Sequence, residues 1–174
     1  MRLLLCFLAV GFALFAGSAS SEEVAKRSVW RFASMIAKAT GRGAWQYTHY
    51  GCWCGLGGKG NPVDAVDRCC VCHDVCYNKL IDRGICNKSR IYLVNYYFTG
   101  SSYPRCLRKK TSGFWRWKKT VNVSRCGYEK CKCDAAAVVC FRRNWFNKKY
   151  RLYNKNKCSK SAALAKYVKQ NTRC

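Results

Sequence analysis

The sequence predicts a mainly α, disulfide-rich fold with two long antiparallel disulfide-linked helices, an N-terminal helix, a glycine-rich loop and a small β-wing. The chain has 15 cysteines, and all but Cys6 follow an apolar leader. The 14 cysteines that remain after Cys6 are an even number, which in an exported chain is typical of a disulfide framework. Two segments carry cysteines seven residues apart, which places each pair on one helix face. These pairs are Cys69 with Cys76 and Cys133 with Cys140.

Residues 1–19 have the pattern of a cleaved secretory signal: a basic residue, an apolar run too short to cross a bilayer comfortably, and small residues. Residues 20–27 are interpreted as a propeptide if the pair Lys26-Arg27 is cleaved, and the alternative is that this pair is ordinary solvated charge. Residues 28–174 would then form one domain with a basic C-terminal extension. No later apolar run is long enough for a membrane span, so we expect a secreted, extracellular protein.

The charge balance is strongly basic, with 33 Lys and Arg, 8 Asp and Glu, and a net charge of +25. Such a surface attracts polyanions, namely anionic membranes, heparin-like sugars or nucleic acid. Solubility alone would not need so uneven a balance. Because acids are scarce, an acid within a motif is more often functional than usual. After residue 27 they are Asp64, Asp67, Asp74, Asp82, Glu129 and Asp134.

The first expected helix begins at Ser28, in SVWRFASMIAKATG, and Gly41 ends it. Its inward face is expected to consist of Val29, Phe32, Ile36 and Ala39. The stretch YGCWCGLGGKGNP at residues 50–62 contains five glycines. Such a stretch forms a loop whose backbone can adopt unusual angles and approach a ligand closely.

The first long helix is predicted to begin with Asn61 as its N-cap and Pro62 in its first position, and to end near Gly84. The second is expected from about Gly127 through residue 146. The segment between them is rich in Thr, Val, Tyr and Trp, with turn signals at 99–100 and 112–113, which predicts a small β-hairpin region. The tail after Asn147 is basic.

Antiparallel packing of the two long helices would bring His73 on the first to the level of Asp134 on the second. A carboxylate facing an imidazole fixes its tautomer and stabilises its protonated form. The sequence has no Gly-x-Ser-x-Gly nucleophile motif, so we interpret His73 as a general base that activates water. The same packing predicts the disulfides Cys69–Cys140 and Cys76–Cys133.

Asp74 projects about 100° further around the helix than His73, so it needs a different partner. The glycine-rich loop is the candidate, because Ca²⁺ takes carboxylate and backbone carbonyl oxygens. The candidate ligands are Asp74 and the carbonyls of Trp53, Gly55 and Gly57. Zinc is disfavoured because the only histidines are His49 and His73. A lone histidine or a glycine-rich loop is usually structural, but their joint arrangement favours a catalytic site.

Three segments resemble the secreted phospholipases A2. YGCWCGLGGKGNPVDAVDRCCVCHDVCY is similar to the calcium loop and catalytic helix of that family, and CKCDAAAVVCF to its second helix. SVWRFASMI resembles the mature N-terminus of the pancreatic-type members. The resemblance is strong over residues 28–77 and 126–141 and weak elsewhere. It implies calcium-dependent hydrolysis of the sn-2 ester of glycerophospholipids.

The resemblance also implies a role for each site residue. His73 would activate water, Asp134 would orient it, and Tyr77 would hydrogen-bond that aspartate. The Gly55 N–H would help to hold the oxyanion. Calcium would bind Asp74 and the carbonyls of Trp53, Gly55 and Gly57, clamp the substrate phosphate and polarise the ester carbonyl.

Four further disulfides follow from the resemblance, and they leave Cys72 and Cys174 as a further pair that could tie down the tail. Cys72 and Lys38 depart from the family pattern, and the segment 105–123 is longer and more basic than expected. The family's second supporting tyrosine is Tyr96 or Tyr97. The implied disulfides are Cys52–Cys158, Cys54–Cys70, Cys86–Cys126 and Cys106–Cys131.

A lipase must dock on a lipid surface, and Trp30, Trp45 and Leu56 are expected at the mouth of the site. GFWRWKKT at residues 113–120 is either a second membrane contact or a segment whose Trp115 and Trp117 pack under the wing. We expect a phospholipid, preferably anionic, membrane surface as partner, heparin-like polyanions as a second class, no nucleic acid, and a monomer. The rival hypotheses are a silent homologue that binds polyanions and an antimicrobial protein that acts through charge alone.

Overall fold

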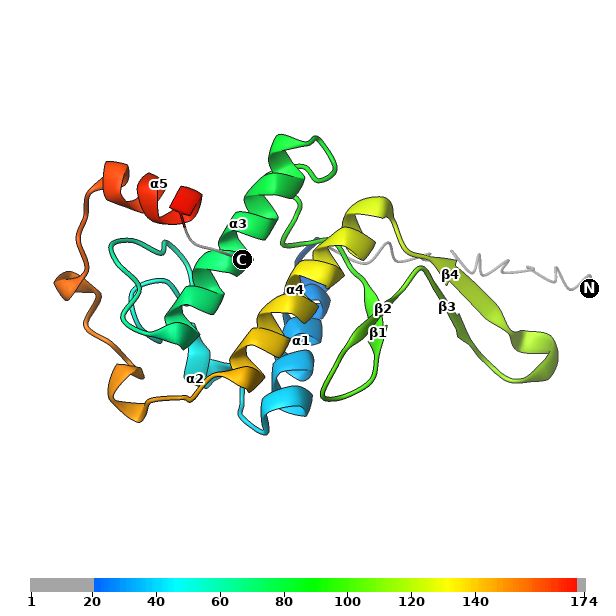
Figure 1. The fold of residues 1–174 in the computed structure, drawn as a ribbon. Coiled ribbons are helices and arrows are strands. Elements are labelled where there is room, and N and C mark those ends of the chain that lie inside the picture. The colour runs from blue at the N-terminus through cyan, green and yellow to red at the C-terminus, as the bar shows by residue number, and fades with distance from the viewer. Residues whose placement is uncertain (1–20, 172–174) are drawn as a thin grey trace, which may run out of the picture.

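Two long helices form the centre of the molecule in the computed structural model, which describes residues 21–171 and the side chains from Ser28 onward. They are α3 (Ala65–Asp82) and α4 (Arg125–Arg143), which lie side by side (Figure 1). The disulfides Cys69–Cys140 and Cys76–Cys133 join them. This pairing requires an antiparallel arrangement, so the predicted stapled helix pair is confirmed. The signal expected at residues 1–19 lies outside the described residues.

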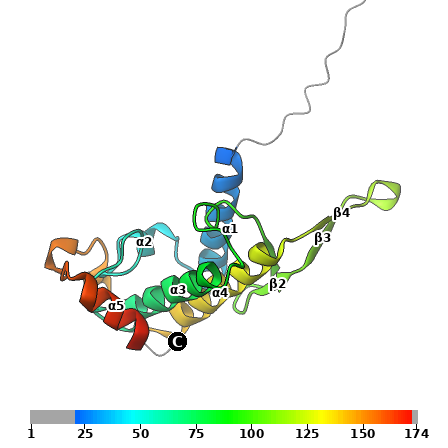
Figure 2. The same ribbon diagram turned by 90° about the horizontal axis from the view of Figure 1, so that it is seen from above.

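Helix α1 (Ser21–Thr40) packs on α4 and is longer than predicted, because it includes residues 21–27. Gly41, with a φ of +68°, follows its end as expected. Met35, Ile36 and Ala39 are buried, whereas Val29 is 62 % exposed. The expectation that Val29 faces inward is therefore wrong. Ser28, the residue before it, is fully buried, so Val29 is exposed because it lies on the outer face of α1. Figure 2 shows α1 extending beyond the α3–α4 pair at its N-terminal end.

The start of α3 also differs from the prediction. The N-cap is Asp64, whose carboxylate accepts a hydrogen bond from the Asp67 N–H at 2.8 Å. Asn61 and Pro62 remain in the preceding loop, so the helix begins later than the Asn-Pro signal suggested. Its end is as predicted, at Asp82 with Gly84 following at a φ of +65°.

Two hairpins lie between the long helices, with turns where the sequence placed them. The first pairs β1 (Tyr97–Thr99) with β2 (Arg105–Leu107), and the second pairs β3 (Lys109–Ser112) with β4 (Lys119–Asn122). A 3₁₀ turn, η1 (Trp115–Trp117), forms the tip of the second. Figures 1 and 2 show this hairpin projecting away from the helices. Trp115 and Trp117 are 78 % and 86 % exposed, so packing under the wing is excluded.

The C-terminal segment returns to the glycine-rich loop. It contains η2 (Lys148–Tyr150), η3 (Lys155–Lys157) and α5 (Ala162–Asn171), while α2 (Trp45–Thr48) precedes the loop. Cys52–Cys158 joins this segment to the loop, and α5 packs on α3. All four disulfides implied by the resemblance are present. They are Cys52–Cys158, Cys54–Cys70, Cys86–Cys126 and Cys106–Cys131.

Cys72 is also disulfide-bonded. Its expected partner, Cys174, lies outside the described residues. Within residues 21–171, no helix is long and apolar enough to cross a membrane.

Candidate active site

The two stapled helices bring His73 and Asp134 together. The His73 Nε2 lies 2.7 Å from the Asp134 Oδ1. The imidazole is 17 % exposed, whereas the carboxylate is fully buried. The Phe32 ring stacks on the imidazole at 4.8 Å, and the Tyr77 ring lies at 4.4 Å. The packing therefore leaves His73 partly exposed to solvent and fixes the plane of its ring.

Two tyrosines complete the hydrogen bonding of Asp134. The Tyr77 hydroxyl donates to Oδ1 at 2.7 Å, and the Tyr96 hydroxyl donates to Oδ2 at 2.5 Å. Tyr96 is therefore the second supporting tyrosine, and Tyr97 instead lies beneath the Arg31 guanidinium at 4.3 Å. Burial and the charge of Asp134 raise the pKa of both Tyr77 and Tyr96, which keeps both hydroxyls as neutral donors.

Asp134 is anionic although it is buried. Burial alone would raise its pKa, but the hydrogen bond from His73 and the charge of Lys130 outweigh that effect, and the net shift is downward. An anionic oxygen next to Nε2 requires the ring proton on that nitrogen. Nδ1 is then left as the acceptor, which is the state that a base for water needs.

Lys130 is a member of the site that the sequence reasoning missed. Its side chain is 3 % exposed, and its Nζ lies 3.4 Å from the Asp134 Oδ2. It donates to the Ser28 Oγ at 2.7 Å and lies 4.6 Å from the centre of the Tyr96 ring. The available signal was its position four residues before Asp134, which places both on one helix face.

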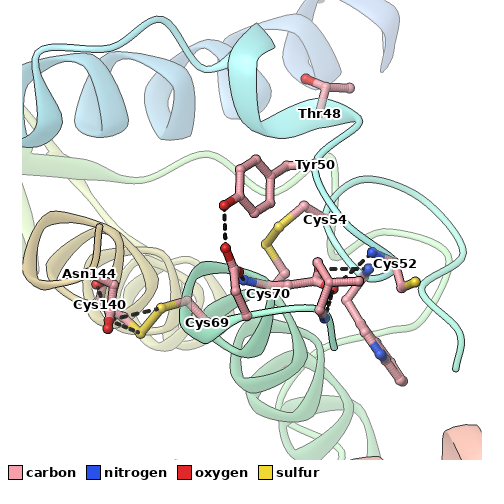
Figure 3. Close-up of a disulfide and its surroundings, with 12 residues drawn as sticks. Thr48, Tyr50, Cys52, Cys54, Cys69, Cys70, Cys140 and Asn144 are labelled. Atoms are coloured by element: carbon pink, nitrogen blue, oxygen red, sulfur yellow. Dashed lines mark hydrogen bonds between the residues drawn. A yellow bond between two sulfur atoms is a disulfide. The ribbon is translucent and has the colours of Figure 1, made fainter. Parts of the chain in front are cut away.

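Asp67 holds the glycine-rich loop against the start of α3. Its buried carboxylate accepts hydrogen bonds from the N–H groups of Cys52 and Trp53, both at 2.8 Å, and of Val63 at 3.0 Å. The disulfide Cys54–Cys70 ties the same loop to the same helix (Figure 3). Asp67 had been noted only as one of the scarce acids. Its role depends on backbone groups that only the folded loop presents.

The loop backbone requires glycine where carbonyl ligands were predicted. Gly55 and Gly57 have φ values of +93° and +73°. A Cβ at Gly55 would lie 2.0 Å from the Thr48 carbonyl oxygen, so only glycine fits there. Trp53 is fully buried, and its indole N–H donates to the Gly60 carbonyl at 2.9 Å. Its side chain thus packs inside the protein, in keeping with a ligand that acts through its backbone.

Asp74 follows His73 on α3 and is half-buried, and it is the acidic ligand predicted for calcium. Burial raises its pKa, and the charges of His73, Lys169 and Lys155 oppose that shift. A partly desolvated carboxylate of this kind is stabilised in its charged form by a nearby cation. Among residues 21–171, no group of three or more His, Cys, Asp or Glu side chains could hold a metal. A cation here would therefore need backbone oxygens beside Asp74, which is a donor set that fits calcium.

Comparison with known proteins decides the family. The family model described as Phospholipase A2 matches residues 29–151. The chain belongs to the phospholipase A2 family. It is 58 % identical over 132 residues, 75 % of this chain and 99 % of the relative, to phospholipase A2 A2-actitoxin-Cgg2a of Condylactis gigantea. It is 40 % identical over 130 residues, 73 % of this chain and 78 % of the relative, to the membrane-associated phospholipase A2 of Homo sapiens.

This phospholipase A2 is accordingly a disulfide-braced hydrolase. The match to the family covers most of α1, the glycine-rich loop and both long helices, and so includes His73, Asp74 and Asp134. Helix α5 (Ala162–Asn171) lies beyond the matched residues. Its packing against α3 nonetheless makes it a neighbour of the site-bearing helix.

Proposed function

We propose that this phospholipase A2 is secreted and hydrolyses the sn-2 acyl ester of glycerophospholipids at membrane surfaces, with calcium as cofactor. The observation that carries the proposal is the 2.7 Å contact between His73 Nε2 and the buried Asp134 carboxylate. It leaves Nδ1 as the ring nitrogen that can accept a proton. A base held in this way beside a glycine-rich loop can activate water without a covalent intermediate.

The reaction begins with proton transfer from water to the His73 Nδ1 while the water oxygen attacks the sn-2 carbonyl carbon. The anionic Asp134 stabilises the resulting imidazolium, and the Tyr77 and Tyr96 hydroxyls hold Asp134 in place. The Gly55 N–H is proposed to donate to the oxyanion. When the tetrahedral intermediate collapses, the ester bond to the glycerol oxygen breaks, and His73 returns its proton to that leaving oxygen.

Asp74 and the carbonyls of Trp53, Gly55 and Gly57 would hold the calcium ion. When bound, calcium supplies positive charge that binds the substrate phosphate and stabilises the developing oxyanion. The protein's own contribution is to hold the loop rigid, through Asp67 and the disulfides Cys52–Cys158 and Cys54–Cys70.

The proposed partner is an anionic phospholipid surface. The net charge of +25 supports attraction to such a surface. Trp30, Trp45 and Leu56 are 70 %, 60 % and 88 % exposed. Leu56 lies in the calcium loop, and Trp30 lies two residues before Phe32, whose ring covers His73. These positions support an apolar rim that contacts lipid.

The test is fatty-acid release by the purified protein from anionic vesicles of a phospholipid with different acyl chains at sn-1 and sn-2. The proposal expects release of the sn-2 chain with calcium and a loss of release when a chelator is added. Release that continues in the chelator would contradict the calcium role. No release by protein with all disulfides formed would instead favour a silent homologue that binds polyanions.

A further inference from the structure

We propose that the β3–β4 hairpin is a membrane anchor separate from the rim of the active site. In this proposal, the aromatic tip enters the interfacial region of an anionic bilayer, and the basic arms bind lipid phosphates. The inference rests on the proposed function only in that it takes a phospholipid membrane as the surface. The tip is defined as residues 113–117, and the arms are β3 and β4.

The tip exposes three large rings in a run of four residues. Phe114, Trp115 and Trp117 are 79 %, 78 % and 86 % exposed. Single exposed apolar side chains are common on protein surfaces, but adjacent large ones mark an interaction site. Phe114 and Trp115 also stack on each other at 6.2 Å with an interplanar angle of 14°, so they present one continuous apolar surface.

The backbone of the tip is built to hold these rings outward. Gly113 has a φ of +103°, and a Cβ there would lie 2.2 Å from the Trp117 carbonyl oxygen. Trp115 itself has a φ of +46°, which is unfavourable for a bulky residue. The Trp117 N–H donates to the Phe114 carbonyl at 3.0 Å and closes the turn. Unfavourable backbone geometry of this kind clusters at functional positions.

The aromatic rings have no role in the protein core. Every side chain of β3 and β4 is exposed, and the strands are held by their ladder and by a hydroxyl contact between Thr111 and Thr120 at 2.9 Å. An isolated two-stranded hairpin is only marginally stable. Folding alone therefore does not explain three exposed aromatic residues at its end.

The charge around the tip is uniformly basic, since the segment 105–125 contains no Asp or Glu. A sulfated sugar could bind the basic side chains but would leave the rings in water. A bilayer interface suits both groups, because aromatic rings lie at headgroup level and each Lys or Arg near an anionic surface adds attraction. The basic residues of the hairpin, from β3 through β4, are Lys109, Lys110, Arg116, Lys118 and Lys119.

The hairpin is placed to act together with the rim of the active site. Figure 2 shows the N-terminal part of α1 rising from the α3–α4 pair and the β3–β4 hairpin extending beyond the end of α4. Val29 and Trp30 on α1 are also exposed. In this proposal one extended lipid surface contacts both elements, which a small soluble ligand could not do. The anchor would hold the enzyme at the bilayer between catalytic cycles.

The test compares vesicle binding of the wild type with that of the triple variant Phe114→Ser, Trp115→Ser, Trp117→Ser. The vesicles contain an anionic ether-linked phospholipid, which the enzyme cannot hydrolyse, and the buffer contains a chelator. We expect affinity to fall by about tenfold or more, since burying even part of three rings exceeds 1.4 kcal/mol. The control is Trp145→Ser, which removes an 84 % exposed ring outside the hairpin and should bind like the wild type.

Turnover of a monomeric short-chain phospholipid with calcium should be the same in all three proteins, because the hairpin is remote from His73. Wild-type affinity of the triple variant for the vesicles would overturn the proposal. So would a loss of heparin binding without a loss of vesicle binding, which would assign the hairpin to a sugar. Because binding is measured without catalysis, an inactive wild type would refute the proposed function and leave this test intact.

A second measurement does not depend on the folding of the triple variant. Lipids with brominated acyl chains quench tryptophan fluorescence on contact. The variant Trp115→Phe, Trp117→Phe keeps the aromatic tip but removes its fluorophores, so we expect it to lose part of the quenching seen with the wild type. An unchanged drop in fluorescence intensity on vesicle addition would show that the tip stays in water and would contradict the proposal.

Discussion

The ring of His73 is held by three neighbours, which have two different effects. Phe32 and Tyr77 fix its plane, and the Asp134 carboxylate fixes the nitrogen that carries the proton. Asp134 can serve in this way because its own surroundings are polar. It accepts from two neutral tyrosine hydroxyls and lies beside the buried ammonium of Lys130. A buried charge is tolerated only with such partners.

The contribution of Tyr96 can be measured by Tyr96→Phe. Removing the hydroxyl takes one hydrogen bond from a fully buried anion, so we expect the free energy of unfolding to fall by about 1.5–3 kcal/mol. Chemical denaturation with all disulfides intact measures it. The matched control is Tyr97→Phe, because Tyr97 is adjacent in sequence but lies under Arg31. An equal loss in the free energy of unfolding for the two substitutions would show that the hydrogen bond from Tyr96 to Asp134 does not stabilise the fold.

At the scale of elements, the cysteine spacing was enough to predict which helices pair and at what level. The register of two disulfides fixes the neighbours of every residue between them, so His73 and Asp134 could be matched before the fold was known. The start of α3 could not be predicted, because Asn61 and Asp64 are both good N-caps, and the choice depends on where the loop carbonyls and amides lie. The spacing of Lys130 from Asp134 could have indicated their contact, but its bond to Ser28 could not be predicted because the two residues are distant in sequence.

The contacts that hold the glycine-rich loop in place could not be predicted from the sequence either. Its composition predicted a ligand-binding backbone. The conformation of that backbone is held by Asp67, whose carboxylate accepts hydrogen bonds from three N–H groups across the loop. Such contacts have no local sequence signature. The chain path must be known before a carboxylate can be assigned to backbone donors.

Asp67→Asn tests the loop as a unit. The amide has one acceptor oxygen in place of two, so at least one of the three N–H groups loses its partner and the loop loosens. We expect calcium affinity to fall by about tenfold, which corresponds to about 1.4 kcal/mol, near the net value of one hydrogen bond. Isothermal titration calorimetry without lipid measures it.

Asp82→Asn is the control, since Asp82 is an exposed acid at the far end of α3. It removes the same charge without touching the loop. Calcium affinity that falls equally in both variants would assign the effect to net charge rather than to loop geometry.

At the scale of the whole molecule, charge and shape act together. In the proposed account, the net charge of +25 attracts the enzyme to anionic surfaces, and the exposed apolar side chains on α1, the glycine-rich loop and the β3–β4 hairpin supply short-range contacts. Charge attracts over about a Debye length, and the apolar side chains act only on contact. The two contributions should therefore respond differently to salt.

Vesicle binding measured at two salt concentrations separates them. Raising the salt from about 0.1 M to about 1 M shortens the Debye length from about 10 Å to about 3 Å, so we expect affinity for anionic vesicles to fall by about tenfold or more. Weak affinity for neutral vesicles should change little. Co-sedimentation in the presence of a chelator gives both values, and strong, salt-insensitive binding to neutral vesicles would contradict the electrostatic part of the account.

The most direct test of the central claim is the rate of sn-2 fatty-acid release by His73→Gln, compared with the wild type at saturating calcium. A general base contributes about 10²–10⁴-fold, so we predict a loss of that size with calcium affinity and thermal unfolding unchanged. Release within about threefold of the wild-type rate by the variant would contradict the account, because that effect lies well below the contribution of a general base.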